Sequence, residues 1–178
     1  MVVIALGITA FALTRQIGVI YERVAPAGAL TLSQAIKLND VAPEIAALTL
    51  GGEKLILGGT NLARAQLLLF VAPDCPICKT LIPTMKSLAL KTSKTNFILV
   101  SDGGEPGEHE GYIKQHDLST FAYVLSEVLS MSYGIAKLPY AVLIRANGTV
   151  GSLGVVDSPE HLERLFKTPT LLGEESTN

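Results

Sequence analysis

Two continuous apolar runs and one helical repeat dominate the middle of the chain. Residues 66–71 and 96–101 each form a short run of the kind found in strands that are buried on both faces of a sheet. Between these runs, apolar side chains recur at helical spacing: Leu81, Ile82, Met85, Leu88 and Ala89. The pattern predicts a strand, an amphipathic helix and a second strand, in that order.

Two glycine-containing turns predict hairpins on either side of this central unit. Gly51-Gly52 lies between two candidate strands near the start of the folded part, and successive glycines can supply the positive φ angles of a tight turn. Asn147-Gly148 joins candidate strands at residues 140–145 and 149–155 and is a typical hairpin turn. We therefore expect antiparallel pairs at both places.

The remaining stretches predict three further helices and a loop. We expect a polar loop over residues 102–108 and helices over residues 110–116 and 127–133. Ser158 is a suitable N-cap for a last helix, and Pro159 suits its first position because no intrahelical N–H bond is lost there.

The N-terminal region is strongly apolar, and residues 1–14 carry no charged side chain. A helix needs about 20 apolar residues to cross a bilayer, so we interpret residues 1–21 as the remaining part of a membrane anchor that begins further upstream. A buried core helix is the alternative, but the domain that follows offers no obvious place for it. Residues 22–40 then form a linker, residues 41–167 the folded domain, and the polar residues 168–178 a disordered tail.

The net charge argues against one large class of partners. It is −2 over 178 residues, and Lys and Arg do not cluster, so the chain lacks the basic surface that nucleic-acid binding requires. Hydrophobic residues make up 48% of the chain, which is ample for the core of one domain. We expect a single folded domain with no nucleic-acid partner.

The chain has only two cysteines, in the sequence Cys75-Pro76-Ile77-Cys78. A domain stabilised by disulfides would carry more cysteines at longer spacings, and a zinc site would need two further ligands. The three histidines are remote from the pair in sequence, and we expect His109 and His116 to be solvated. We therefore predict no metal and no cofactor, which leaves redox chemistry as the role of the pair.

The position of the pair indicates how it works. The cysteines stand where the predicted helix begins, with Pro76 at its first position. The positive end of a helix dipole favours a thiolate, so Cys75 is the predicted nucleophile and Cys78 the residue that resolves the mixed disulfide with a substrate protein. Two buried thiols that merely pack are the alternative.

The order of elements resembles that of thioredoxin. The resemblance implies an α/β thioredoxin-like fold: a central mixed sheet flanked by helices, here with an extra N-terminal β-hairpin and the N-terminal apolar anchor helix. In this fold a proline before the penultimate hairpin is commonly cis, and the residue before it pairs with bound substrate. Those residues are Pro139 and Leu138, and with Pro76 and Ile77 they form the predicted substrate-binding set. An ordinary loop proline is the alternative.

From about residue 41 to residue 166 the chain resembles the membrane-anchored thioredoxin-like proteins of the bacterial periplasm. A narrower resemblance covers nearly the whole chain, because residues 15–30, 75–81 and 134–144 look like the accessory proteins of methylamine utilisation. The match in the linker is the most telling, since no thiol chemistry requires it.

This resemblance implies a periplasmic thiol–disulfide oxidoreductase or isomerase. Its client would be the small (β) subunit of methylamine dehydrogenase, which needs its many disulfides correctly paired. The resemblance also implies an N-terminal anchor in the cell inner membrane, a soluble domain in the periplasm and an unidentified membrane or periplasmic redox partner. An aromatic amine dehydrogenase fits these residues equally well as the client.

Two departures from the thioredoxin pattern leave the redox direction open. Asp74 replaces the usual tryptophan before the first cysteine, and Leu69 occupies the position of a buried acid in the preceding strand. Without that acid, proton transfer to or from Cys78 needs another route. The dipeptide Pro76-Ile77 matches neither the reducing nor the oxidising members of the fold.

Three other functions are open from the residues. The protein is either a periplasmic reductant for other clients, such as cytochrome c apoproteins, or a non-catalytic chaperone that uses the fold to hold its client. A peroxiredoxin-like peroxidase is the third, but such sites place a threonine where this chain has Ala72.

Overall fold

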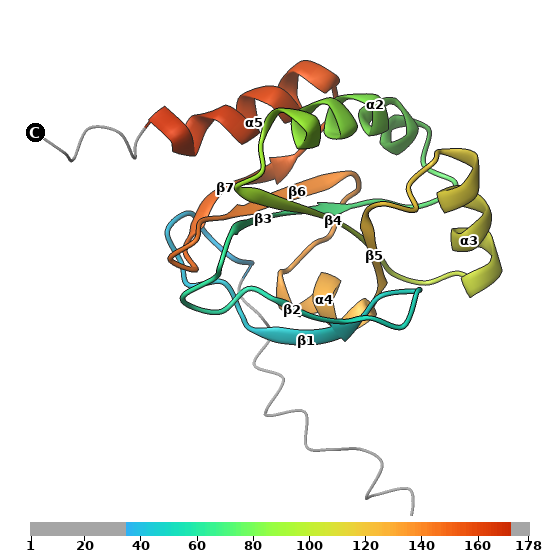
Figure 1. The fold of residues 1–178 in the computed structure, drawn as a ribbon, viewed down its shortest axis with the longest axis horizontal. Helices are drawn as coiled ribbons and strands as arrows, with labels where there is room; N and C mark the ends of the chain where they lie inside the picture. The colour runs from blue at the N-terminus through green and yellow to red at the C-terminus, as the bar shows by residue number, and fades with distance from the viewer. Residues whose placement is uncertain (1–34, 172–178) are drawn as a thin grey trace, which may run out of the picture. The chain divides into compact units, whose positions relative to one another are not determined.

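A five-stranded mixed sheet forms the centre of the fold (Figure 1). The computed structural model describes residues 35–171. In chain order, its elements are β1 (Ile45–Leu48), β2 (Lys54–Leu57), β3 (Ala65–Phe70), α2 (Pro76–Lys91), β4 (Thr95–Ser101), α3 (Pro106–Gln115), β5 (Ala122–Leu125), α4 (Glu127–Ser132), β6 (Tyr140–Ile144), β7 (Val150–Val155) and α5 (Pro159–Leu171).

The strand order in the sheet is β5-β4-β3-β6-β7. β3 pairs parallel with β4, and β4 pairs parallel with β5, while β6 is antiparallel to both β3 and β7. The parallel steps are made through α2 and α3, because a parallel crossover needs a long connection. The prediction of a central mixed sheet flanked by helices is confirmed.

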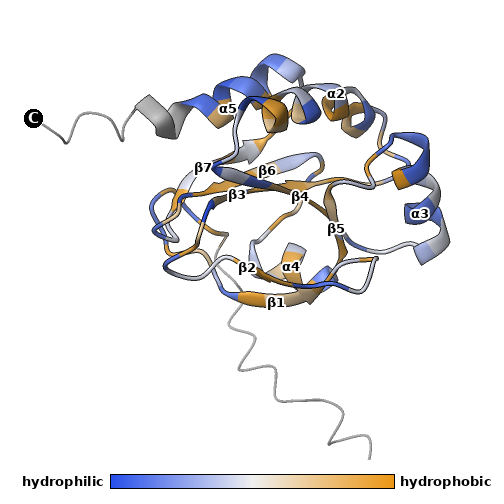
Figure 2. Cartoon of the chain, viewed as in Figure 1, coloured by the Kyte–Doolittle hydropathy of each residue, from blue (hydrophilic) through white to orange (hydrophobic). Residues whose placement is uncertain are grey.

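The sheet is covered on both faces, which explains the continuous apolar runs in β3 and β4. We call the face that packs against α2, α3 and α5 the helix face, and the face that packs against α4 and the β1–β2 pair the hairpin face (Figure 1). Figure 2 shows the hydrophobic residues concentrated on the central strands, with hydrophilic residues on the outer sides of α3 and α5. Because both faces of the sheet are covered, successive residues of β3 alternate between the buried cluster of the helix face and that of the hairpin face.

One buried polar side chain attaches β2 to the hairpin face. β1 and β2 pair antiparallel, with Ile45 opposite Leu57. The side-chain oxygen of Gln66, in β3, accepts a hydrogen bond from the Gly58 N–H at 2.9 Å, and its amide group donates to the Ile56 carbonyl at 2.9 Å. These two bonds satisfy backbone groups that no strand pairing reaches.

Two local predictions were wrong. The predicted loop over residues 102–108 contains the first turn of α3, which begins at Pro106, a favourable first helical residue. β5 was not predicted at all. It has only four residues, and a run that short resembles a loop when its sheet partner is unknown. The start of the last helix is as predicted, since the Ser158 hydroxyl accepts from the His161 N–H at 3.3 Å.

The predicted anchor at residues 1–21 lies outside the described residues. Within residues 35–171, no helix is both long enough and apolar enough to cross a membrane. The end of the predicted linker packs on the domain: Ile36 is buried, and the Asn39 N–H donates to the Val150 carbonyl at 2.9 Å. The predicted disordered tail cannot begin at residue 168, because α5 extends to Leu171. The rest of the division, into anchor, linker and domain, stays a prediction.

Candidate active site

Cys75 occupies the N-cap of α2, and Pro76 is the first residue of that helix. The Cys75 backbone is extended, with φ −78° and ψ 112°, and its Sγ accepts a hydrogen bond from the Cys78 N–H at 3.2 Å. The first N–H groups of a helix have no intrahelical partner, and the helix dipole is positive at that end. The site therefore supplies a donor and a positive potential to the sulfur of Cys75.

The two cysteines form a disulfide, with their Cα atoms 5.3 Å apart. Their surroundings differ strongly. Cys75 is half-buried, whereas Cys78 has no exposed surface and belongs to the buried cluster of the helix face. A thiol of an attacking protein can therefore reach Cys75 but not Cys78.

The Leu138–Pro139 peptide bond is cis. β3 and β6 pair antiparallel with Phe70 opposite Tyr140. The residues that follow Phe70 and those that precede Tyr140 thus emerge at the same edge of the sheet. The dithiol and the cis-proline are brought to one edge by this register, and Leu138 packs against both buried clusters there.

The surface beside Cys75 combines apolar and charged residues. Ile77 exposes 44% of its surface, Pro76 is exposed, and Leu138 is half-buried. The charged neighbours along the chain, Asp74 and Lys79, are both exposed. All four residues predicted to bind substrate thus lie next to the cysteines in the chain or at the same sheet edge.

Cys78 is buried in a cluster of hydrophobic residues. Leu69, on the helix face of β3, is buried in the same cluster as Cys78. Among the described residues, no Asp, Glu, Lys or Arg is buried, and the buried polar side chains are Gln66, Ser101, His109, Ser130 and Ser152.

A buried polar network on the helix face was missed by the sequence analysis. His109 is only 1% exposed, so the expectation that it is solvated was wrong. Its Nε2 lies 2.9 Å from the Gly103 carbonyl oxygen and its Nδ1 lies 2.9 Å from the Tyr123 hydroxyl. A carbonyl can only accept, so Nε2 donates to it, and in a neutral ring Nδ1 accepts from Tyr123.

Tyr123 of this network and Tyr112, whose ring packs edge-on against it, are both held in their neutral form. Burial raises the pKa of Tyr123 to about 12. Burial also raises the pKa of Tyr112 to about 12, with a smaller contribution from Tyr123. The sequence contained a signal for this network, because His109, Tyr112 and His116 are spaced to share one face of a helix.

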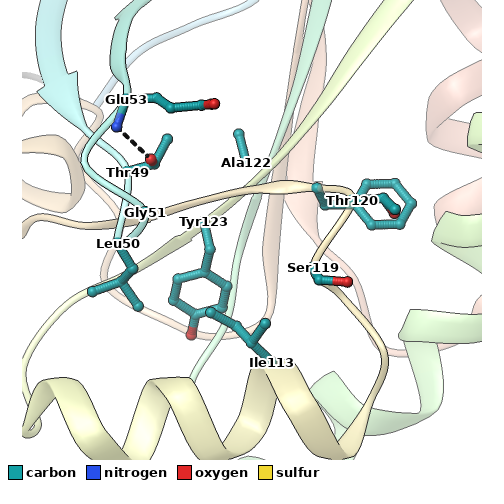
Figure 3. A pocket seen from close by; sticks show the side chains of 10 residues that line it. Thr49, Leu50, Gly51, Glu53, Ile113, Ser119, Thr120, Ala122 and Tyr123 are labelled. Atoms are coloured by element: carbon teal, nitrogen blue, oxygen red, sulfur yellow. Dashed lines mark hydrogen bonds between the residues drawn. The ribbon is translucent and has the colours of Figure 1, made fainter.

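A cleft beside Tyr123 is separate from the dithiol. It has a volume of about 420 Å³ and lies between the β1–β2 turn, α3 and the start of β5 (Figure 3). Its lining residues are Thr49, Leu50, Gly51, Glu53, Ile113, Ser119, Thr120, Phe121, Ala122 and Tyr123. Neither cysteine is among them. Within residues 35–171, no group of three metal-binding side chains comes together.

The sheet order, the disulfide-bonded Cys-x-x-Cys pair at a helix start and the cis-proline at the same edge define a thioredoxin-like thiol–disulfide oxidoreductase. In agreement with this class, residues 64–150 match a family model described as thioredoxin-like. The fold resembles a putative thiol:disulfide interchange protein DsbE from Chlorobium tepidum, with a TM-score of 0.68 and 21% identity, over 76% of this chain and 99% of that one.

Curated relatives identify the family more narrowly. The chain is 36% identical to the methylamine utilization protein MauD of Paracoccus versutus over 164 residues, which are 91% of this chain and 82% of that protein. It is also 36% identical to MauD of Methylophilus methylotrophus over 166 residues, which are 93% of this chain and 78% of that protein. The chain belongs to the MauD family of methylamine utilization proteins.

Proposed function

We propose that this protein exchanges disulfides through Cys75 and Cys78 during maturation of the methylamine dehydrogenase small subunit, in the periplasm. The observation that carries the proposal is an asymmetric dithiol at the N-terminus of α2, in a chain of the MauD family. Cys75 is accessible and receives an N–H bond, so it is the nucleophile. Cys78 is buried behind it and closes the disulfide.

The client chain binds at the sheet edge beside the dithiol. Pro76 and Ile77 offer apolar contact area next to Cys75, and the backbone at Leu138 and Pro139 lies at the same edge. These four residues position a client cysteine for attack. No cofactor takes part, because the electrons pass between sulfur atoms only.

The site works outside the cytoplasm. A disulfide exchanger for an exported client needs an oxidising compartment, and the apolar residues 1–21 supply an anchor in the inner membrane. A linker over residues 22–40 carries the domain that begins at residue 41. A membrane or periplasmic redox partner returns the dithiol to its working state.

A trapping experiment tests this function. In Cys78→Ala the mixed disulfide between Cys75 and a client cannot be resolved by Cys78, so it persists until a client thiol displaces Cys75. The variant is expressed in a host growing on methylamine, the cells are quenched with acid and an alkylating agent, and adducts of Cys75 are identified by mass spectrometry. The expected main adduct is the small subunit of methylamine dehydrogenase.

Two controls give the experiment its discrimination. Cys75→Ser/Cys78→Ala should trap nothing, which shows that adducts form through Cys75. A broad set of exported proteins would contradict a dedicated client, and an adduct dominated by apocytochromes would favour a general reductant. If Cys75→Ser/Cys78→Ser still supports maturation of the enzyme, the protein acts as a chaperone and the proposed chemistry is wrong.

A further inference from the structure

The described part of the helix face leaves Cys78 without a group that could take its proton. Only a thiolate attacks a disulfide, so Cys78 must lose a proton before it can resolve a mixed disulfide at Cys75. Burial in apolar surroundings disfavours the charged form of a thiol. The rate of resolution therefore depends on whether a base lies beside Cys78.

The titratable side chains that pack in the same cluster are unsuitable bases. Tyr112 and Tyr123 both have a pKa near 12, so they hold their protons at neutral pH. His109 is buried next to Tyr123, but both of its ring nitrogens are already engaged. Leu69, on the strand that precedes the dithiol, belongs to the same cluster, and its side chain cannot accept a proton.

More distant groups on the neighbouring elements are also excluded by position. The ring of His116 packs at an angle on Tyr112, and its Nε2 is buried with no hydrogen-bond partner among the described residues. The His116 carbonyl accepts from Lys86 at 2.7 Å, which places this histidine beside Lys86. Lys86 lies eight residues after Cys78 in α2, which is about 12 Å along the helix. From β4, Asp102 follows the strand and is only half-buried.

On α2 itself, and on α5, the charged groups are also outside the cluster. Asp74 and Lys79 are exposed beside the dithiol. Glu163 and His161 of α5 are paired with Lys167 and Asp157 near the surface.

We infer that Cys78 resolves mixed disulfides slowly, so that the reduced protein acts as a disulfide isomerase on its client and not as a net reductant. The inference rests on the proposed function and specifies the reaction at the same site. Cys75 thiolate attacks a client disulfide, forms a Cys75–client disulfide and releases a client thiolate. A second client thiolate then attacks the client sulfur of this bond, forms a new client disulfide and releases Cys75 thiolate. No electrons are gained or lost overall.

The competing route needs Cys78. Its thiol gives a proton to water, the thiolate attacks Cys75, and the Cys75–Cys78 disulfide forms as the client leaves with both of its sulfurs reduced. Client thiols are solvated and ionise more readily than the buried Cys78. Rearrangement within the client is therefore faster than its release in reduced form.

Attack by Cys75 and attack by Cys78 can be followed separately by stopped-flow absorbance with the disulfide reagent 5,5′-dithiobis(2-nitrobenzoate), which releases coloured thionitrobenzoate. The reduced full chain is mixed with one equivalent of the reagent. Attack by Cys75 releases the first coloured thiolate, and attack by Cys78 releases the second. We expect the second release to be slower by about tenfold or more at pH 7, and to accelerate by about tenfold per pH unit up to about pH 9.

Failure of the proposed function and failure of this inference give different results in the experiment. If no rapid first release occurs, the proposed chemistry at Cys75 is wrong. If the first release is rapid and the second is equally fast, or stops rising with pH near neutrality, Cys75 works as proposed but the slow resolution by Cys78 is overturned. A second step that slows in Asp102→Asn would also overturn it, because that carboxylate would then be the base.

A matched pair of variants tests the cause. Leu69→Asp places a carboxylate in the cluster of Cys78 and should speed the second release about tenfold at pH 7, whereas Leu69→Asn, which has the same shape without the charge, should not. An equal response of both variants would contradict the inference.

Isomerisation itself is measured on scrambled ribonuclease. Cys78→Ala should restore its activity within about twofold of the rate of the unaltered protein, since the client's own thiols complete the reaction. This measurement does not depend on the folding of the Leu69 variants. Loss of isomerisation in Cys78→Ala would overturn the inference.

Discussion

The two faces of the central sheet use polar groups in opposite ways. On the hairpin face, the buried amide of Gln66 bonds to the backbone of β2 on both of its sides. On the helix face, the dithiol lies at the edge of a cluster that includes Leu69, and the buried His109 bonds to groups outside the dithiol. On the hairpin face a buried amide holds the β1–β2 pair in place, whereas on the helix face Cys78 is buried among hydrophobic residues and bonded to Cys75.

This difference predicts whether a mutation should change the stability of the protein or the reactivity of its dithiol. Changes on the hairpin face should alter the free energy of unfolding and leave the reactivity of Cys75 unchanged. Changes near α2 should alter the reactivity of the dithiol at little cost in stability. The following experiments test this separation.

Gly58→Ala should give the largest effect on stability. Gly58 has φ +71°, and a Cβ there would collide with the carbonyl oxygen of Pro43. We expect a loss of about 3 kcal/mol in the free energy of unfolding, measured by urea denaturation, because both the backbone conformation and the space favour glycine. Gly111→Ala is the control, since Gly111 lies in α3 with open space around it and should stabilise by up to about 1 kcal/mol.

Gln66→Leu should destabilise the hairpin face by about 2 kcal/mol. The substitution leaves the Gly58 N–H and the Ile56 carbonyl without their partner. Urea denaturation measures the loss, and alkylation of Cys75 in the reduced protein should proceed at an unchanged rate. Gln115→Leu, at the exposed end of α3, should stay within about 0.5 kcal/mol of the unaltered protein. A changed Cys75 rate would break the separation of the two faces.

The buried tyrosines should make the protein lose stability in alkali. Their folded pKa, about 12 for Tyr112 and Tyr123, exceeds the usual value near 10, so the unfolded chain releases these protons first. Stability should be complete below about pH 10 and should fall as the pH rises towards 12, by up to about 1.4 kcal/mol per pH unit for each tyrosine. Tyr133 on the hairpin face adds to this, because burial raises its pKa as well.

Tyr112→Phe sharpens this test. Within the described residues the Tyr112 hydroxyl has no hydrogen-bond partner, so its removal should cost little stability at pH 7. Above about pH 10 the free energy of unfolding should fall less steeply with pH, because one titrating tyrosine is missing. Tyr123→Phe should lower the slope equally but also cost about 1 kcal/mol at pH 7, since His109 loses its hydrogen bond. Urea denaturation of the oxidised protein at several pH values distinguishes them. Equal stability of both variants at pH 7 would contradict the assignment of that bond.

Asp74→Asn should have the smallest effect, and only on reactivity. A carboxylate about 6 Å from a thiolate in water opposes it by about 0.7 kcal/mol, which is about threefold in rate. Alkylation of Cys75 by iodoacetamide should therefore be about threefold faster in the variant near pH 6, with no change in unfolding. Glu160→Gln removes a remote charge on α5 and should leave the rate unchanged. An equal acceleration by both would assign the effect to net charge.

The sequence was sufficient for those parts of the fold that depend on local pattern. The apolar runs of β3 and β4 are visible because both faces of these strands are buried, and Pro76 with Cys75 marks the start of α2. Gln66 stands inside such a run, and nothing local shows that its partner is the backbone of β2. The isomer of the Leu138–Pro139 bond is likewise decided by the surrounding structure, since sequence alone permits both.

The errors on the helix face have a related cause. α3 exposes most of its residues, so its polar first turn resembled a loop, and its start at Pro106 was missed. His109 and His116 are spaced to share a helix face, but both were expected to be solvated, because nothing local shows that α3 turns His109 towards the sheet. In the folded chain His109 lies inside α3 and is buried. β5 becomes a strand only through its pairing with β4.

The turn between β1 and β2 offers a place where the molecule can be lengthened. Gly51 and Gly52 are both exposed, and side chains added there would meet little or nothing. Exposed loop tips of this kind tolerate insertions. An epitope inserted between these glycines would label the protein while both chain ends and the dithiol edge keep their natural sequence. Because Gly51 lines the cleft of Figure 3, the same insertion would show whether that cleft must stay open for the protein to support growth on methylamine.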